Sequence, residues 1–348
     1  MADFADIIDQ EQMKEHMQHV LQTEKVSHAY IISGENGSGK EFIARIFAKA
    51  LQCENKNMRG EYLESCNECP SCVKALSENH PDIITITHEK PNSIGVDDIR
   101  SQLRDDVVIK PYESRYKIYI IPEGEKMTAA AQNALMKTLE EPPAYIVIII
   151  LTSNINAFLP TIISRCIVLP MKVARDDSIK KFLMEECQIV DYKAMLCASF
   201  ARGNVGKALD LAANERFETL KNETIELVTK LKHLEIHDIM DRVHMILEPA
   251  EGDEKSSKKG IDLRQYADFM DILIFLFRDM LVYKATENED HLIFTDKVSY
   301  IRSVTREISY EEIGNIIKDM EIAKSRITSN VNIDLALELM LLSMKEHL

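Results

Sequence analysis

The chain has 348 residues, of which 45% are hydrophobic and 28% charged, a composition typical of globular proteins with two or three domains. No apolar run is long enough to cross a bilayer, and the acidic first residues lack the basic and apolar regions of a signal peptide, so we expect a cytoplasmic protein without a membrane partner. The formal net charge of −15 argues against tight DNA binding by the chain alone, because that affinity depends on Lys and Arg neutralising phosphates.

Short apolar runs rich in β-branched residues alternate with helical patterns over the first half of the chain. The expected strands are residues 29–32, 83–87, 118–121, 145–151 and 167–169, and the expected helices include 41–51, 96–104 and 128–141. Strands that alternate with helices form a parallel sheet covered on both faces. The sequence therefore predicts an α/β domain over residues 1–169.

The strand pattern ends after Pro170. Three short helical patterns at 176–187, 192–201 and 205–214 predict a small helical domain over residues 170–215, and longer helical patterns predict an all-α domain over 216–348. The polar segment 251–260 is expected to be a flexible loop. A final helix over 331–344 is apolar around most of its circumference, so we expect it to be surrounded, either in its own bundle or partly by another subunit.

A glycine-rich loop, GENGSGKE at residues 34–41, lies between the first expected strand and the first expected helix. Such a loop at a helix N-terminus is typical of nucleotide phosphate binding. The candidate residues for binding a nucleotide are Gly34, Gly37, Gly39 and Lys40.

This loop lacks the residue that normally holds magnesium. Ser or Thr follows the lysine in the working pattern, but here the residue is Glu41. A carboxylate about 4 Å from a phosphate costs roughly 4 kcal/mol at an effective dielectric of 20, unless a bound Mg²⁺ takes it as a ligand. The strand 118–121, which should end in a second metal-binding carboxylate, runs into Pro122-Glu123. We expect no Mg²⁺ at this chain, and whether ATP or ADP binds stays open.

Four cysteines form the strongest metal signal. Cys53 is followed after twelve residues by Cys66, Cys69 and Cys72, so the insert spans about residues 53–72. Thiols stay reduced in the cytosol, and clustered thiols there favour a metal over disulfides. Four thiolates complete a tetrahedral zinc shell with no open position, which predicts a structural site. Iron and sulfur are the alternative, because that chemistry also uses closely spaced cysteines.

Two groups of basic residues are candidates for phosphate contact. Arg100 and Arg104 lie one expected helical turn apart, and Lys110, Arg115 and Lys117 follow, so one face of the domain could touch a DNA backbone or could simply be solvated.

Arg165 stands in the sequence Ser-Arg-Cys just before the expected strand 167–169. It could pair with a carboxylate such as Glu140 or Glu141, or reach a phosphate on another subunit.

Taken together, these motifs resemble the clamp-loader branch of the AAA+ ATPases, which are subunits of the bacterial DNA polymerase III assembly. The resemblance rests on HAY at 28–30, the phosphate loop, the cysteine insert, KIYII at 117–121, QNALMKTLEEPP at 132–143 and SRC at 164–166. It covers most of the first 210 residues with specific motifs and the rest only as a helical pattern. It implies an AAA+ domain with a zinc insert, a small lid domain and an all-α collar domain.

Within this family the resemblance implies a subunit that does not hydrolyse ATP. Catalytic members carry Thr after the lysine, Asp-Glu at the strand end and an arginine in the lid, whereas this chain has Glu41, Pro122-Glu123 and Gly206, with Lys207 as a neighbouring substitute. Arg165 would then reach the ATP of an adjacent gamma/tau subunit. The implied partners are gamma/tau and delta subunits and, through the assembly, the sliding clamp and primed DNA.

Two other functions stay open. One is a working gamma/tau-like ATPase in which Glu41 or Glu123 binds magnesium by unusual geometry. The other is a zinc-dependent nucleic-acid-binding protein with a vestigial phosphate loop, although the acidic net charge weighs against it.

Overall fold

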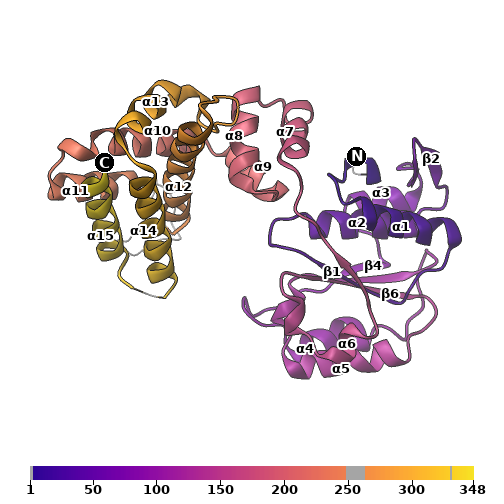
Figure 1. Cartoon of the computed structure of the whole chain (residues 1–348). Coiled ribbons are helices and arrows are strands. Elements are labelled where there is room, and N and C mark those ends of the chain that lie inside the picture. The colour runs from indigo at the N-terminus through magenta and orange to yellow at the C-terminus, as the bar shows by residue number, and fades with distance from the viewer. Residues whose placement is uncertain (1–2, 248–262, 330) are drawn as a thin grey trace. The chain divides into compact units, whose positions relative to one another are not determined.

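The computed structural model describes residues 3–247, 263–329 and 331–348 (Figure 1). The chain divides into two compact units. The first unit contains Met1–Glu186 and Ala201–Ala208, and the second contains Cys187–Phe200 and Leu209–Leu348. The segment 251–260, expected to be a loop, lies outside the described residues. Among the helices that are described, none is both long and apolar enough to span a membrane.

A five-stranded sheet forms the centre of the first unit. Its strands are β1 (Ala29–Ser33), β4 (Ile83–Thr85), β5 (Lys117–Ile121), β6 (Ile146–Thr152) and β7 (Ile167–Pro170). Their spatial order is β4-β5-β6-β1-β7, and every neighbouring pair is parallel. Each strand overlaps one of the five predicted from the sequence, so the predicted parallel sheet is confirmed.

Helices cover both faces of this sheet, as the alternating pattern predicts (Figure 1). One face carries α1 (Glu11–Thr23) and α2 (Lys40–Gln52); the other carries α4 (Val96–Ile99), α5 (Ala129–Glu140) and α6 (Pro160–Ile163). Successive residues of β1 show the division, because Tyr30 lies in one core cluster with Phe47 and Ile31 lies in the other with Leu135. A strand buried on both faces explains why its sequence is apolar without alternation.

The predicted helix 96–104 is α-helical only over its first half. It continues as a π-helical turn, η2 (Arg100–Arg104), in which the Asp105 amide donates to the Arg100 carbonyl at 2.9 Å. This wider turn keeps Leu103 fully buried while Arg100 is exposed.

The cysteine insert lies between α2 and β4. It contains a hairpin of β2 (Asn57–Arg59) and β3 (Tyr62–Glu64), followed by α3 (Pro70–Leu76). A short turn near the start of the chain, η1 (Phe4–Asp6), packs beside this hairpin because its Phe4 and Ala5 amides donate to the buried Glu64 carboxylate at 3.0 and 3.1 Å.

Helices make up most of the remaining described residues. They are α7 (Asp176–Glu185), α8 (Asp191–Ala201), α9 (Val205–Ala213), α10 (Glu215–Lys230), α11 (Ile236–Leu247), α12 (Leu263–Thr286), α13 (Val298–Glu307), α14 (Tyr310–Thr328) and α15 (Ile333–His347). Short 3-10 turns occur at η3 (Gly124–Lys126), η4 (Ile155–Ala157), η5 (Leu231–His233) and η6 (Thr295–Lys297).

The last helix, α15, differs from its predicted environment. Leu337, Met340 and Leu341 are buried, but Leu335 is 51% exposed and Leu339 is 46% exposed. Among the described residues, α15 contacts α14, α11 and η5, and these leave Leu335 and Leu339 exposed. The expectation that its own bundle surrounds the helix is therefore wrong for these two residues.

Candidate functional site

The glycine-rich loop joins β1 to α2, as the sequence predicts. Gly37 and Gly39 have φ values of +79° and +92°, and Gly39 is the residue that precedes the first turn of α2. Glycine is favoured at both positions because other residues rarely adopt this left-handed conformation. The spacing of the glycines is thus explained by the backbone path.

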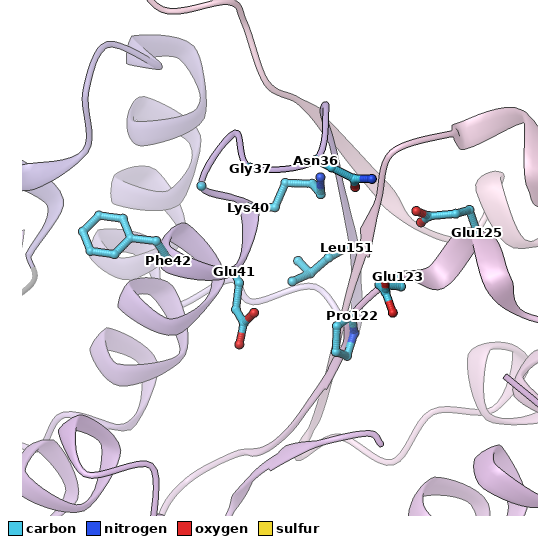
Figure 2. Close-up of a pocket in the computed structure, with 10 residues that line it drawn as sticks. Asn36, Gly37, Lys40, Glu41, Phe42, Pro122, Glu123, Glu125 and Leu151 are labelled. Atoms are coloured by element: carbon cyan, nitrogen blue, oxygen red, sulfur yellow. The ribbon is translucent and has the colours of Figure 1, made fainter. Parts of the chain in front are cut away.

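Lys40 turns back onto the loop that carries it (Figure 2). Its Nζ donates to the Gly34 carbonyl and to the Glu35 carbonyl, both at 2.7 Å. Burial lowers the pKa of Lys40, and the nearby charges of Glu125 and Glu35 oppose this effect. The lysine that would contact a phosphate therefore already has two acceptors within the chain.

A cavity of about 290 Å³ opens beside the loop (Figure 2). Its lining includes Lys40 and three carboxylates, those of Glu41, Glu123 and Glu125, together with Pro122 at the end of β5. The loop and the carboxyl end of this neighbouring strand meet here, which is where open α/β sheets place their ligands.

Each of the three carboxylates is engaged with another residue of this chain. Glu41 accepts from Arg45 at 2.7 and 3.0 Å. Glu123 lies 2.7 Å from Lys126 and 3.2 Å from His88, and the bond from Lys126 contributes most to lowering the pKa of Glu123.

Glu125 is a site residue that the sequence reasoning missed. Its carboxylate accepts from the Ser153 hydroxyl at 2.6 Å and the Ser153 amide at 3.2 Å. Burial opposes ionisation, but bonds led by that from the Ser153 hydroxyl outweigh it and lower the pKa of Glu125. The only sequence signal was an acidic residue shortly after a predicted strand.

Gly206, which stands where catalytic relatives are expected to carry an arginine, lies against the phosphate loop. Its amide donates to the Gly37 carbonyl at 2.9 Å, and a Cβ atom at this position would lie 2.4 Å from that same oxygen. A side chain longer than hydrogen therefore has no room here unless the backbone shifts.

Arg165 follows α6 and is 37% exposed. One terminal nitrogen lies 3.2 Å from the Glu140 carboxylate, and the other donates to the Thr161 carbonyl at 3.0 Å. Of the two sequence interpretations, pairing with Glu140 is present in the structure. The other, contact with a phosphate on another subunit, stays a prediction.

The basic cluster predicted between residues 100 and 117 is only partly available to a ligand. Arg100 is 52% exposed with its nearest carboxylate, that of Asp97, at 3.8 Å, and Arg104 is half-buried. Lys117 is fully buried, and its Nζ lies 2.8 Å from the Asp106 carboxylate. The inclusion of Lys117 in a phosphate-binding face was therefore wrong, because the loop after η2 covers it.

The four predicted cysteines come together in one buried group. The sulfur atoms of Cys53, Cys66, Cys69 and Cys72 all lie within 4.8 Å of one another. The Cys53–Cys66 and Cys66–Cys72 sulfur distances are 3.6 and 3.9 Å. A tetrahedral ZnS₄ shell with bonds of about 2.3 Å requires sulfur separations of roughly 3.8 Å. The group is thus compatible with a zinc site.

Backbone amides donate to two of these sulfurs, and at Cys66 they favour the thiolate. The amides of Cys66 and Cys69 donate to the sulfurs of Cys53 and Cys66, both at 3.3 Å. Burial raises the pKa of Cys53 and Cys72, whereas the amides of Glu68 and Cys69 outweigh burial at Cys66 and lower its pKa to about 6.

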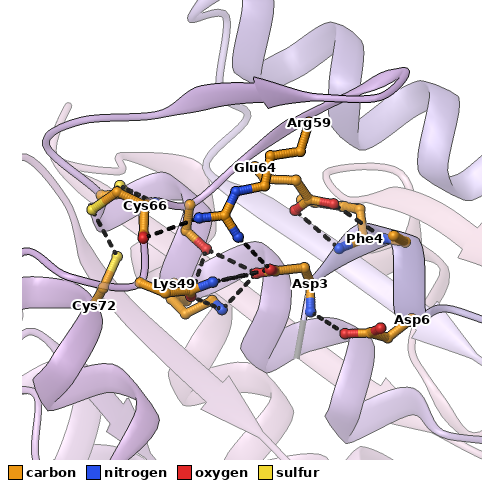
Figure 3. Close-up of polar contacts among 12 residues, drawn as sticks. Asp3, Phe4, Asp6, Lys49, Arg59, Glu64, Cys66 and Cys72 are labelled. Atoms are coloured by element: carbon orange, nitrogen blue, oxygen red, sulfur yellow. Dashed lines mark hydrogen bonds and ion pairs between the residues drawn. The ribbon is translucent and has the colours of Figure 1, made fainter. Parts of the chain in front are cut away.

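A polar network ties the cysteine insert to the rest of the first unit (Figure 3). The Lys49 ammonium, on α2 and only 4% exposed, donates to Asn67 at 2.6 Å and to Asp3 at 3.0 Å. Asn67 lies between Cys66 and Cys69 with a φ of +62°, and its side chain also donates to Asp3 at 2.9 Å. The conformation of the cysteine loop therefore affects the environment of a buried charge.

His80 links Ser71 of the insert to Asp82 and Ser114 by hydrogen bonds. Its Nδ1 accepts the Asp82 amide at 3.0 Å, so the proton is on Nε2, which lies 3.2 and 3.3 Å from the hydroxyls of Ser114 and Ser71. Burial lowers the pKa of His80 more than the charges of Asp82 and Glu113 raise it. Protonation would leave two donors facing each other at Nδ1.

We therefore expect acid to destabilise this region through His80. Because its folded pKa lies below the ordinary value of about 6.5, its contribution is fully present above that pH and is lost as the pH falls toward the folded pKa. Urea unfolding at about pH 7.5 and about pH 5.5 should show a larger loss of free energy in the unaltered chain than in His80→Gln. Equal losses would contradict this role, and the other histidines are common to both proteins.

Comparison with known proteins identifies the family. A family model described as DNA polymerase III, delta subunit, matches residues 9–175, and a second, for the C-terminal part of that subunit, matches residues 259–346. The tau subunit of Bacillus subtilis is 33% identical over 326 residues, and the alignment covers 90% of this chain but 56% of that protein. The delta' subunit of the same organism is 28% identical over 327 residues, covering 94% of this chain and 93% of that protein.

One solved structure aligns with most of this chain. A gamma subunit-related protein of DNA polymerase III from Thermotoga maritima aligns with a TM-score of 0.45 and 20% identity, covering 97% of this chain and 99% of that one. The two family models together span both units, and the delta' relative matches over nearly its whole length. The chain belongs to the family of DNA polymerase III clamp-loader subunits.

Proposed function

We propose that this chain is a delta-prime-type subunit of the clamp loader, which does not hydrolyse ATP itself. In this proposal it supplies Arg165 to the ATP of a neighbouring gamma/tau subunit and, with gamma/tau and delta subunits, helps to place the sliding clamp on primed DNA. The coverage supports this type, because the chain spans 93% of the delta' relative and 56% of the tau relative.

The main support for the proposal is that the residues expected to bind magnesium at the phosphate loop are replaced. Phosphoryl transfer requires a metal that neutralises charge on the phosphates and a group that positions the attacking water. The residue after Lys40 offers no hydroxyl, and Glu41 is bonded to Arg45 instead. The strand that should end in a metal-binding carboxylate leads into Pro122. Both usual magnesium anchors are therefore replaced.

The position of Arg165 supports donation to a neighbour. The guanidinium has five N–H donors, and two contacts within the chain leave others unused. A partly exposed side chain held by Glu140 and Thr161 has few conformations to lose when it binds a phosphate. Such pre-organisation is favourable for a residue that acts across an interface.

We assign zinc to the four-cysteine group in this proposal, with a structural role. Four thiolates would fill the shell and leave no position for a reacting water. Iron and sulfur remain the alternative, and the colour of the purified protein distinguishes them.

The isolated chain with ATP and Mg²⁺ tests the absence of hydrolysis. We expect no release of ADP above that of Lys40→Ala, because the metal anchors are missing. A rate that depends on magnesium and disappears in Lys40→Ala would overturn the proposal. That result would instead support a gamma/tau-like ATPase, which the higher identity to the tau relative favours, with Glu41 or Glu123 as a metal ligand.

A further inference from the structure

Glu125 has a fixed position beside the phosphate loop. It belongs to η3, which packs against β6 so closely that a Cβ at Gly124 would lie 2.5 Å from the Ile150 side chain. Its two carboxylate oxygens accept from the hydroxyl and from the amide of Ser153, the residue directly after β6, at 2.6 and 3.2 Å. The carboxylate is therefore held at the end of this strand.

The phosphate loop is held next to the same strand end. The Gly34 amide, at the start of the loop, donates to the Thr152 carbonyl at 3.0 Å, one residue before Ser153. Farther along the loop, the Asn204 side chain, which also caps α9, donates to the Asn36 carbonyl at 2.7 Å. Separating the loop from the Glu125 carboxylate would therefore break hydrogen bonds.

Glu125 and Lys40 line the same cavity of about 290 Å³. In Figure 2 the Lys40 ammonium and the Glu125 carboxylate point toward the same part of this cavity. Burial lowers the pKa of Lys40, and of the two charges that oppose this effect, those of Glu125 and Glu35, that of Glu125 is the stronger. A nucleotide phosphate that reached Lys40 would therefore meet the negative charge of Glu125.

The other two carboxylates of the cavity each face a cation of this chain. Glu41 pairs with Arg45 at 2.7 Å and Glu123 pairs with Lys126 at 2.7 Å, and the two charges of such a pair partly cancel at the loop. Both carboxylates are also about half exposed, so water and salt screen them. Glu125 is half-buried and is bonded to an uncharged serine. Of the three, it therefore presents the least compensated charge to a ligand.

We infer that Glu125 is a specificity-determining residue of the phosphate loop, because its carboxylate keeps metal-free nucleotide phosphates away from Lys40. The inference deepens the proposed function and rests on it in one respect, namely that a subunit that does not hydrolyse ATP can act without a nucleotide at its own loop. It adds a second cause to the missing magnesium anchors, since the cavity repels the phosphates themselves.

Two substitutions at position 125 separate the charge of the side chain from its size. Glu125→Gln removes the charge but keeps the length and one oxygen that can accept from Ser153, whereas Glu125→Asp keeps the charge on a shorter side chain. Asp319→Asn is the matched control, because Asp319 is also half-buried and accepts from a serine hydroxyl, that of Ser343, but does not line the cavity. It changes the net charge of the chain by the same amount as Glu125→Gln.

Binding of a fluorescent ADP analogue and of pyrophosphate to the full chain, in EDTA, measures the effect. We expect Glu125→Gln to bind both ligands about ten-fold more tightly than the unaltered chain at about 50 mM salt, because a like charge is removed, and this gain to shrink at about 500 mM salt. Glu125→Asp and Asp319→Asn should bind like the unaltered chain. The thermal midpoints without ligand should show that all four proteins are folded.

No gain of affinity in Glu125→Gln, or no measurable binding by any of the proteins, would overturn the inference. An equal gain in Glu123→Gln would assign the effect to the total charge of the cavity, and an equal gain in Asp319→Asn would assign it to the net charge of the chain, and either result contradicts a specific role of Glu125. Because EDTA removes magnesium, these outcomes do not depend on hydrolysis. ATP turnover by the unaltered chain with magnesium would contradict the proposed function and leave the binding comparison intact.

Discussion

Arg165→Ala is expected to lower the ATP turnover of a reconstituted clamp loader while leaving this chain folded. An arginine that stabilises the charge of the transferred phosphoryl group is worth about 10³ to 10⁵ in rate in the best-studied GTPases. That loss applies to the one site that Arg165 would serve, so total turnover should fall to what the remaining sites supply. The measurement is steady-state ADP release by the complete assembly with clamp and primed DNA.

The thermal midpoint of Arg165→Ala shows whether a loss of ATP turnover comes from the missing arginine or from misfolding. Within the chain, Arg165 makes one ion pair with a half-exposed Glu140 and one bond to a carbonyl, and exposed pairs contribute only about 0 to 1 kcal/mol. The thermal midpoint should therefore change little. Arg175→Ala is a matched control, because Arg175 is also exposed and pairs with a carboxylate, that of Asp9, at 3.1 Å.

The turnover with Arg165→Ala and with a second variant, Glu140→Gln, tests the role of Arg165. Normal ATP turnover by an assembly that contains Arg165→Ala in full stoichiometry would contradict the proposed role of Arg165. Glu140→Gln tests how the arginine is held, because the amide can still accept a bond but no longer carries charge. We expect a smaller loss of turnover with Glu140→Gln than with Arg165→Ala.

The sequence predicted those parts of the site whose conformation depends on residues close together in the chain. The phosphate loop was predictable because Gly37 and Gly39 need left-handed backbone, and the strands were predictable because both faces of the sheet are buried. The cysteines were predictable because closely spaced thiols often share a metal, and the structure brings their four sulfurs within 4.8 Å of one another.

The parts that sequence missed depend on contacts between distant segments. Asn204 reaches Asn36 across 168 positions, and no local pattern distinguishes it from any other helix cap. Lys117 belonged to a basic run in sequence, but the chain folds the loop of Asp106 and Ile109 over it and buries its charge. Charge patterns show which residues are basic, whereas only packing shows which of them reach solvent.

If zinc occupies the four-cysteine group as we propose, its removal is expected to unfold the insert and leave the sheet intact. Structural zinc contributes about 10 to 16 kcal/mol to small zinc-finger peptides, comparable to the whole stability of an ordinary domain. The insert has only a hairpin of two three-residue strands, β2 and β3, and the short helix α3. The sheet has its own core on both faces, and the half-buried Tyr62 and Leu63 of the insert pack only against the edge of one of these cores.

Loss of the insert should also weaken the network around Lys49. That ammonium is buried, and the side chain of Asn67 supplies one of its acceptors from inside the cysteine loop. Leaving a buried donor without its partner costs about 1 to 3 kcal/mol, and more for a charged group. The thermal midpoint of the first unit should therefore fall, although its sheet stays protected.

Cys72→Ser tests this expectation, with Cys187→Ser as the matched control, because Cys187 is a half-buried cysteine outside the group. We expect about one zinc per chain in the control, as a four-thiolate site requires, and much less in Cys72→Ser. Hydrogen exchange should show lost protection in the insert and retained protection in β1, β5 and β6. A Cys72→Ser protein with full zinc content and normal protection would contradict a structural metal here. If the control protein contains iron and absorbs visible light, the four cysteines hold an iron–sulfur cluster and not zinc.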